Sequence, residues 1–231
     1  MVEKNRRRYR YEMKFSLSNY HANLLKQELK CVMQLDPHSV SQDLSYHIRS
    51  LYFDNPLSTA YLEKMDGVEN RKKYRIRFYN SDLSLIKLEC KHKHDMMTWK
   101  ESCTITKEEA EALIKGELRI GHDNRELLVS FIEDQIIHHL TPSVLVDYDR
   151  LVYVYDVSEV RITFDYHIRS GRYDTDLFDF DTNSLSVLDP GQVVLEVKCN
   201  EFIPQHILNL LSRIPKVREA ISKFALCRSI K

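Results

Sequence analysis

Segments in which polar and apolar residues alternate recur along this 231-residue chain. Alternation with a period of two is typical of half-buried β-strands, because successive side chains point to opposite faces of a sheet. Most of these segments are rich in Val, Ile, Tyr and Phe, which favour an extended backbone. The pattern predicts eight strands, at residues 8–16, 45–53, 72–79, 84–93, 98–105, 144–155, 160–169 and 193–199.

Helical patterns are fewer than strand patterns. Thr106 followed by Glu109 is typical of a capping box at the start of a helix. The chain has no internal repeat and no break in composition, so we expect one α+β domain over residues 1–231. Its antiparallel sheet of about eight strands is expected to close into a barrel with the helices packed outside. The predicted helices are 18–33, 56–64, 106–115, 124–138 and one or two within 203–226, broken at Pro215.

The composition disfavours several kinds of protein. Only five glycines are present, and neither G-x-x-x-x-G-K-[ST] nor G-x-G-x-x-G occurs, which argues against the glycine-rich phosphate loops. Five scattered cysteines without a C-x-x-C pair argue against a disulfide framework or a zinc knuckle, and we expect a cytoplasmic protein. No run approaches 18 apolar residues and no signal peptide is evident, so no membrane span is expected.

Positive charge gathers on one face of several predicted strands. The chain has no net charge, yet residues 71–100 contain nine Lys or Arg and only three acidic residues. In strand 72–79 the alternation places Lys73, Arg75 and Arg77 on one face. In strand 84–93 the corresponding face carries three lysines and Glu89, while Ile86, Leu88 and Cys90 lie on the other.

Two interpretations of this basic face are open. A solvated sheet face often carries Lys and Glu, and Lys also protects the edges of sheets. However, like charges two residues apart recur on several strands here, and arginines at R-x-R spacing suit bidentate phosphate contacts. If the sheet closes, the basic faces point into a lumen that repels itself unless it holds a polyanion. A few glutamates there would be able to hold a divalent cation.

Four short motifs on these faces resemble the triphosphate tunnel (CYTH-like) superfamily. They are Glu12-x-Lys14, Arg75-x-Arg77, Glu89-x-Lys91-x-Lys93 and Glu196-x-Lys198. Their order is most similar to the VTC-type polyphosphate polymerase domain, and the resemblance extends over nearly the whole chain. Further matching pieces are Arg150 in DYDR, Arg161 in VRITFD and the run Ser222-Lys223-Phe224.

One position departs from other members of that superfamily. Triphosphatases and adenylyl cyclases typically begin with E-x-E-x-K, whereas Arg10 stands at the first glutamate position here. Replacing an acid by a cation favours holding phosphate chains over two-metal hydrolysis. No SPX or membrane-spanning part accompanies the motifs, so we expect a stand-alone, bacterial-type domain.

The resemblance implies an enzyme that transfers the γ-phosphoryl group of ATP to a growing polyphosphate chain in a cationic tunnel, with Mn²⁺ or Mg²⁺. ATP and inorganic polyphosphate are then the expected partners. The residues expected to hold the triphosphate and act in catalysis are Arg75, Arg77, Lys91, Arg150 and Arg161. Those expected to bind substrate along the tunnel are Glu12, Lys14, Lys93, Lys198 and Lys223. Glu196 is the expected metal ligand, with Glu89 either a second ligand or an ion-pair partner of Lys87 or Lys91.

Other functions remain open at this point. One alternative is a triphosphatase or cyclase of the same fold, and another is a module that binds polyphosphate or a phosphorylated ligand without turnover. Nucleic-acid binding is disfavoured, because the basic faces lack aromatic platforms for stacking bases. Trp99 is interpreted as a core residue rather than a platform for adenine, and the acidic segment 174–181 as a solvated loop.

Overall fold

The computed structural model describes residues 10–37, 39, 45–95, 97–119, 123–171, 173–181 and 183–230, and its main element is one large antiparallel sheet. All eight predicted strands are confirmed, although residues 8 and 9 of the first lie outside the described residues. The eight strands are β1 (Tyr11–Ser18), β3 (Tyr46–Asp54), β4 (Arg71–Tyr79), β5 (Asp82–His94), β6 (Met97–Ile105), β7 (Thr141–Tyr155), β8 (Val160–Ser170) and β10 (Gln192–Cys199). Three two-residue strands also pair with the sheet: β2 (Gln34–Leu35), β9 (Leu185–Ser186) and β11 (Val217–Arg218).

The sheet is curved but not closed, so the expectation of a closed barrel is wrong. Its strands follow the order β11-β1-β10-β8-β7-β3-β4-β5-β6. A closed barrel would need β1 to pair along its length with β6, but β11 occupies that side of β1, opposite Phe15 and Ser16. Within the described part of the chain, β1 and the β5–β6 hairpin meet through an isolated bridge between Arg10 and Thr98 and an ion pair between Lys91 and Glu12.

Local sequence explains several of the helix ends in the described part of the chain. Ser18 accepts a hydrogen bond from the His21 backbone at the start of α1, and the predicted capping box of Thr106 and Glu109 starts α3. Before Pro215 the chain turns extended, so the predicted 203–226 region is two helices with β11 between them. The helices are α1 (Asn19–Leu29), α2 (Thr59–Met65), α3 (Lys107–Lys115), α4 (Glu126–His138), α5 (Gln205–Arg213) and α6 (Lys223–Arg228).

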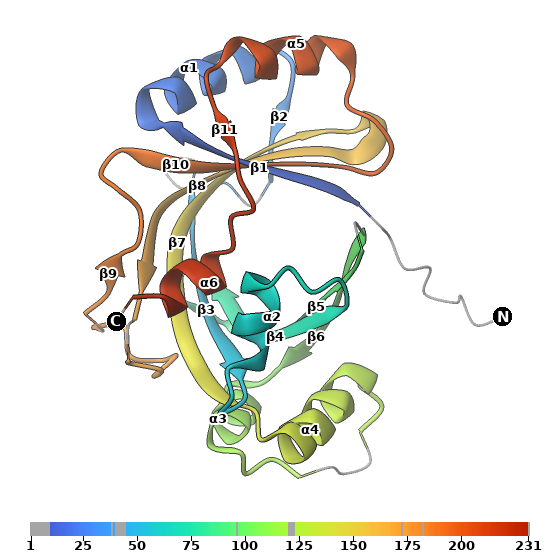
Figure 1. The fold of residues 1–231 in the computed structure, drawn as a ribbon, viewed down its shortest axis with the longest axis vertical. Helices are drawn as coiled ribbons and strands as arrows, with labels where there is room; N and C mark the ends of the chain where they lie inside the picture. Colours follow the sequence, from blue (N-terminus) through green and yellow to red (C-terminus); the bar gives the residue numbers. More distant parts are fainter. Residues whose placement is uncertain are drawn as a thin grey trace, which may run out of the picture.

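Two pairs of helices cover the outer face of the sheet in two separate places (Figure 1). Helices α1 and α5 pack on β1, β10 and β8, whereas α3 and α4 pack on β4 and β5. Ile86, Leu88 and Cys90 are fully buried in this second core, as their position in the alternation predicts. Burying a side chain the size of leucine or isoleucine contributes about 1.5–3 kcal/mol, so each core stabilises the packing of its helices on the sheet.

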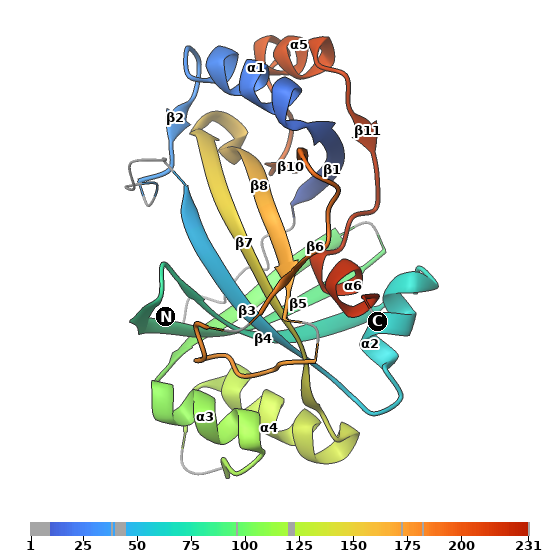
Figure 2. The same cartoon turned by 90° about the vertical axis from the view of Figure 1, so that its left-hand side faces the viewer.

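Helices α6 and α2 lie on the opposite, concave face of the sheet (Figure 2). Phe224 and Cys227 of α6 pack against a third apolar cluster that includes Tyr148 and Ile168. The concave face is therefore apolar where α6 covers it and carries ionisable side chains beside that helix. No helix in the described ranges is both long and apolar enough to cross a membrane.

Candidate functional site

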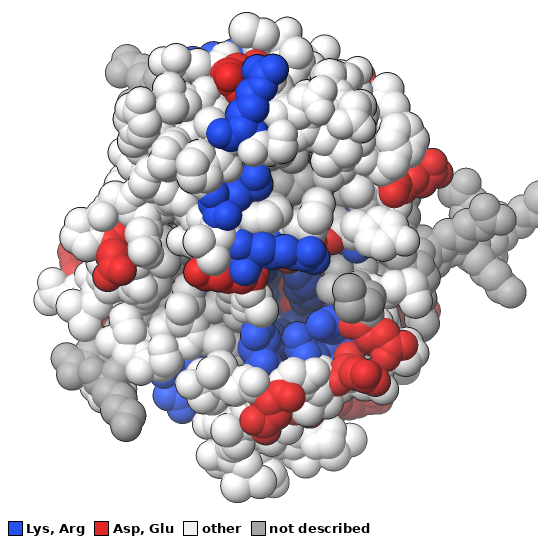
Figure 3. Space-filling model, turned by 45° about the horizontal axis from the view of Figure 1, so that its top comes forward, with Lys and Arg blue, Asp and Glu red and all other residues white. Residues whose placement is uncertain are grey.

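Charged side chains fill the part of the concave face that the apolar clusters leave free. Figure 3 shows Lys and Arg side chains gathered in a hollow of the molecule, with acidic side chains around it. We call the set defined here by its contacts the inner-face cluster. Its basic members are Lys14, Lys73, Arg75, Arg77, Lys91, Lys100, Arg150, Arg161, Lys198 and Lys223, and its acidic members are Glu12, Asp36, Glu89, Asp165 and Glu196.

Glu89 is the centre of the first group of contacts. Its side chain is 1% exposed and lies 2.6 Å from Arg75 Nη2 and 2.6 Å from Lys100 Nζ, with Arg77 Nη1 at 3.9 Å. Burial alone would raise the pKa of Glu89, but these three cations hold it well below its usual value. Its ion-pair partners are therefore Arg75 and Lys100, and not Lys87 or Lys91 as the sequence suggested.

Hydroxyl groups fix the two arginines of strand β4. Arg75 donates to the Tyr52 hydroxyl at 2.8 Å, and Arg77 donates to Ser50 Oγ and to the Tyr148 hydroxyl, each at 2.9 Å. Strands β3 and β4 pair directly at these positions, which brings the partners together. The two guanidinium groups are thus held in fixed orientations by these hydroxyl groups and, for Arg75, by Glu89.

Asp165 organises a second group that the sequence did not single out as part of the site. Arg150 binds both of its carboxylate oxygens, at 2.7 and 2.9 Å, and Lys223 of α6 also contacts it. The ring of Tyr148 lies beneath these cations, 5.1 Å from the Arg150 guanidinium and 4.8 Å from the Lys223 amine. The alternation in VRITFD, residues 160–165, places Asp165 on the same face as Arg161, and this pattern is the signal by which the sequence could have identified it.

The third group joins strands β1 and β10. Glu12 and Glu196 are close enough for a hydrogen bond between their carboxyl groups, and Lys14 contacts them at 3.2 and 3.9 Å. Lys198 lies 3.2 Å from Glu196, and Lys91 reaches Glu12 from β5 at 2.9 Å. Burial opposes ionisation of Glu196, but Lys198 and Lys14 nevertheless hold its pKa well below the ordinary value. The structure therefore brings together five of the predicted residues from three strands.

Arg161 lies at the edge of the inner-face cluster. It pairs with Asp36 at 2.9 Å and donates to the Tyr46 hydroxyl at 3.3 Å. Asp36 follows the short strand β2, and no sequence motif pointed to it.

Lys73 and Lys93 differ from the other predicted cations. Burial, together with repulsion from Arg71 and Lys64, lowers the pKa of Lys73 to about 7. Burial and Arg71 also lower the pKa of Lys93. Neither amine forms an ion pair with a carboxylate in the described part of the chain, and the Lys73 amine lies 4.7 Å from the centre of the Phe224 ring.

In strand β8, alternation counted from Arg161 would also place His167 and Arg169 on the basic face, but these two side chains are not there. His167 has a φ of 47°, and the pairing of β7 with β8 shifts register beside it. After this bulge the side chains that face inward are Ile168 and Ser170, which contact the third apolar cluster and α6. Arg169 consequently lies with Asp147 on the outer side.

Trp99 also lies on the outer face. Its ring stacks on His92 with ring centres 4.7 Å apart and planes within 3° of parallel. Lys100, the next residue, points the other way and reaches Glu89.

The charged groups offer limited ligation for a divalent cation. No three His, Cys, Asp or Glu side chains within the described ranges come together as a metal-binding group. The paired carboxylates of Glu12 and Glu196 fit an Mg²⁺ or Mn²⁺ ion whose remaining ligands are water and phosphate oxygens. Arg75 and Lys100 bind the two oxygens of Glu89, and Lys91 likewise binds both oxygens of Glu12.

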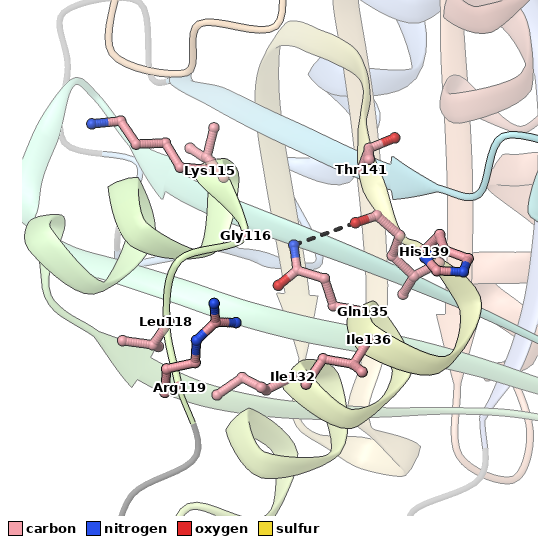
Figure 4. A pocket seen from close by; sticks show the side chains of 11 residues that line it. Lys115, Gly116, Leu118, Arg119, Ile132, Gln135, Ile136, His139 and Thr141 are labelled. Atoms are coloured by element: carbon pink, nitrogen blue, oxygen red, sulfur yellow. Dashed lines mark hydrogen bonds between the residues drawn. The ribbon is translucent and has the colours of Figure 1, made fainter.

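Two pockets lie outside the inner-face cluster. One of about 410 Å³ lies between α3, α4 and the start of β7 (Figure 4). Gln135 projects into its centre and donates to the Leu140 carbonyl oxygen at 3.3 Å. The other, of about 450 Å³, lies beside α2 and the segment before α6. None of the predicted site residues lines either pocket.

Solved structures from three organisms share this fold. A candidate adenylyl cyclase from Hippeastrum with a dominant triphosphatase activity is 18% identical, with a TM-score of 0.54 over 96% of this chain and 95% of that chain. A candidate adenylate cyclase from Vibrio parahaemolyticus is 13% identical, with a TM-score of 0.52 over 96% and 98% of the two chains. The PH1012 protein from Pyrococcus horikoshii is 11% identical, with a TM-score of 0.52 over 94% and 98%. At these identities the likeness is one of fold.

The sequence itself matches the VTC domain family over residues 9–230. No curated protein matches it. The match includes every motif of the inner-face cluster and all the described strands and helices. The chain therefore belongs to the VTC domain family.

Proposed function

We propose that this protein is a polyphosphate polymerase that transfers the γ-phosphoryl group of ATP to the end of a polyphosphate chain bound on its concave face. The observation that carries the proposal is the inner-face cluster, in which basic side chains outnumber carboxylates although the whole chain has no net charge. A buried surplus of cations is stabilised by a polyanion of matching charge. Membership of the VTC domain family supports the same substrate class.

The proposed reaction needs no nucleophilic side chain. An oxygen of the terminal phosphate attacks the γ-phosphorus of ATP, the bond from that phosphorus to the β–γ bridging oxygen breaks, and ADP leaves with the bridging oxygen. Catalysis of such a transfer comes from positioning and from neutralising charge on the oxygens. Arg75 and Arg77, held by Tyr52, Ser50 and Tyr148, are oriented for that purpose.

The other cations have related roles in this proposal. Arg150 and Lys91 bind triphosphate oxygens, and Arg161 binds them at the edge of the site. Lys14, Lys198 and Lys223 hold the chain, with Glu12 keeping Lys14 and Lys91 in place. Glu196 with Glu12 would hold a divalent cation, which supplies further neutralisation of the phosphate oxygens.

The direct experiment is product analysis after incubation with ATP and Mn²⁺. We expect ADP and phosphate chains longer than triphosphate, resolved by gel electrophoresis. Arg75→Ala should reduce the rate about 100-fold or more, since it removes a donor to the reacting phosphate. Arg213→Ala is the matched control, because Arg213 on α5 is 66% exposed. Full activity in the double variant Arg75→Ala/Arg77→Ala would refute the assignment of the site.

A module that binds polyphosphate without turnover is the second candidate. The absence of a three-ligand metal group among the described residues favours it, as does Arg10 at a position that is glutamate in the hydrolases the motifs resemble. Calorimetry with tripolyphosphate separates the two candidates. Tight binding without ADP release over hours supports the module, whereas orthophosphate or cyclic AMP as product would indicate a triphosphatase or cyclase.

A further inference from the structure

A second group of cations lies next to the inner-face cluster, at the open end of the β4–β5 hairpin, which is the end farthest from the turn between Tyr79 and Asp82. It consists of Lys64 on α2, Arg71 at the start of β4 and Lys93 near the end of β5, and we call it the strand-end cluster. The pairing of β4 with β5 sets Arg71 directly opposite Lys93 and sets Lys73 directly opposite Lys91. Like charges placed directly opposite each other destabilise a sheet.

Within the described part of the chain, the strand-end cluster lacks the carboxylate partners that most cations of the inner-face cluster have. Arg75, Arg150 and most other inner cations each form an ion pair with an acid. In the ranges that the structure describes, neither Lys64 nor Lys93 forms such a pair, and Arg71 donates only to the Val68 carbonyl oxygen. Glu63 and Asp95 attract Arg71 and Lys93 from a greater distance.

Burial and mutual repulsion lower the pKa of both lysines of the strand-end cluster. Burial lowers the pKa of Lys64, and Arg71, Lys14 and Lys93 lower it further. Burial and Arg71 lower the pKa of Lys93 in the same way. Arg71 and Lys64 also lower the pKa of Lys73, as do Lys14 and Lys91. Lys73 lies between Arg71 and Arg75 on the same face of β4 and opposite Lys91, so it links the two clusters.

We propose that the strand-end cluster is a separate binding site for the extended part of a polyphosphate chain, beyond the three phosphates that the inner-face cluster holds. A cation without a carboxylate partner can bind a phosphate without first breaking an ion pair, so each phosphate contact adds to the binding free energy. A triphosphate fills the inner-face cluster, and only a longer chain reaches past Lys73 to Arg71, Lys93 and Lys64. This inference rests on the proposed function for its ligand class.

The test compares short and long ligands on two matched double variants. Arg71→Gln/Lys93→Gln removes two charges from the strand-end cluster. Lys30→Gln/Lys115→Gln removes two charges from exposed positions at the ends of α1 and α3. Affinities for tripolyphosphate and for a chain of some tens of phosphates are measured by calorimetry without nucleotide. Because like charges face each other at Arg71 and Lys93, the first variant is expected to keep or raise its melting temperature.

We expect the Arg71→Gln/Lys93→Gln variant to bind the long chain about tenfold more weakly, with tripolyphosphate affinity changed less than about threefold. The control variant should show neither change. Equal losses for both ligands, or no loss for the long chain, would overturn the inference. ADP release from ATP is recorded in parallel: a protein that binds long chains through this cluster without turnover refutes the polymerase proposal and leaves the inference intact.

Discussion

Binding of a polyanion should add a proton to Lys73. Its pKa of about 7 in the free protein means that about one-quarter of the molecules carry a charged Lys73 at pH 7.5. Phosphate oxygens beside this amine reverse the repulsion from Arg71 and Lys64 and return the pKa toward the ordinary lysine value. Binding at pH 7.5 should therefore take up about three-quarters of a proton at Lys73, and at pH 6 only about one-tenth.

The measurement is calorimetry of tripolyphosphate binding in two buffers that differ in ionisation enthalpy. The slope of the observed binding enthalpy against the buffer's ionisation enthalpy gives the number of protons that the complex takes up on binding. Tripolyphosphate exchanges protons of its own, so the informative quantity is the difference between the wild type and Lys73→Met. Lys115→Met, at an exposed position on α3, is the control.

The difference between wild type and Lys73→Met should be about three-quarters of a proton at pH 7.5 and should nearly vanish at pH 6. The folded protein lowers the pKa of Lys73 below its unfolded value, so folding with this lysine is unfavourable at all pH values below that unfolded value. Lys73→Met should accordingly raise the free energy of unfolding at pH 7. Equal proton uptake by the two proteins at pH 7.5 would refute the assignment of Lys73 as a buried, unpaired cation facing the ligand.

Three further perturbations follow from the contacts. Glu89→Gln should cost about 3–5 kcal/mol of unfolding free energy at pH 7, because it leaves buried cations unpaired. The depressed pKa of Glu89 means that its contribution is complete above about pH 4.5 and is lost as the pH falls, so urea unfolding should depend less on acid pH in the variant. Tyr148→Phe should weaken tripolyphosphate binding about fivefold, because it removes the hydroxyl that orients Arg77. Tyr153→Phe is the control and should leave binding unchanged, because the Tyr153 hydroxyl is buried and has no partner among the described residues. Thr106→Ala should lower the free energy of unfolding by about 1 kcal/mol in urea titrations, through loss of the helix cap alone, with binding unaffected.

The strands and the division of their faces were predictable because alternation is local. Each strand of period two assigns its residues to faces without reference to the rest of the chain. Ile86, Leu88 and Cys90 are accordingly in the outer core, and Arg75 and Arg77 are on the inner face. The resemblance of the motifs to the VTC-type domain agrees with the family match over residues 9–230.

Departures from alternation were not predictable in the same way. The bulge at His167 depends on how β8 pairs with β7, and it moves Arg169 to the other face. The open sheet depends on β11, a two-residue strand that lies beside β1 although nearly the whole chain separates them in sequence. Neither feature leaves a period in the sequence that a local pattern could detect.

The sequence by itself determined that cations would share one face of this sheet, since side-chain direction follows from position within each strand. Only the tertiary structure decided which acid each cation pairs with. Glu89 forms ion pairs with Arg75 and Lys100, and Asp165 forms ion pairs with Arg150 and Lys223. Pairing depends on strand register and curvature, which bring together residues far apart in the chain. Among the residues that the structure describes, the same pairing leaves Lys73 without an acid, and that distinction between paired and unpaired cations could not be obtained from composition or spacing.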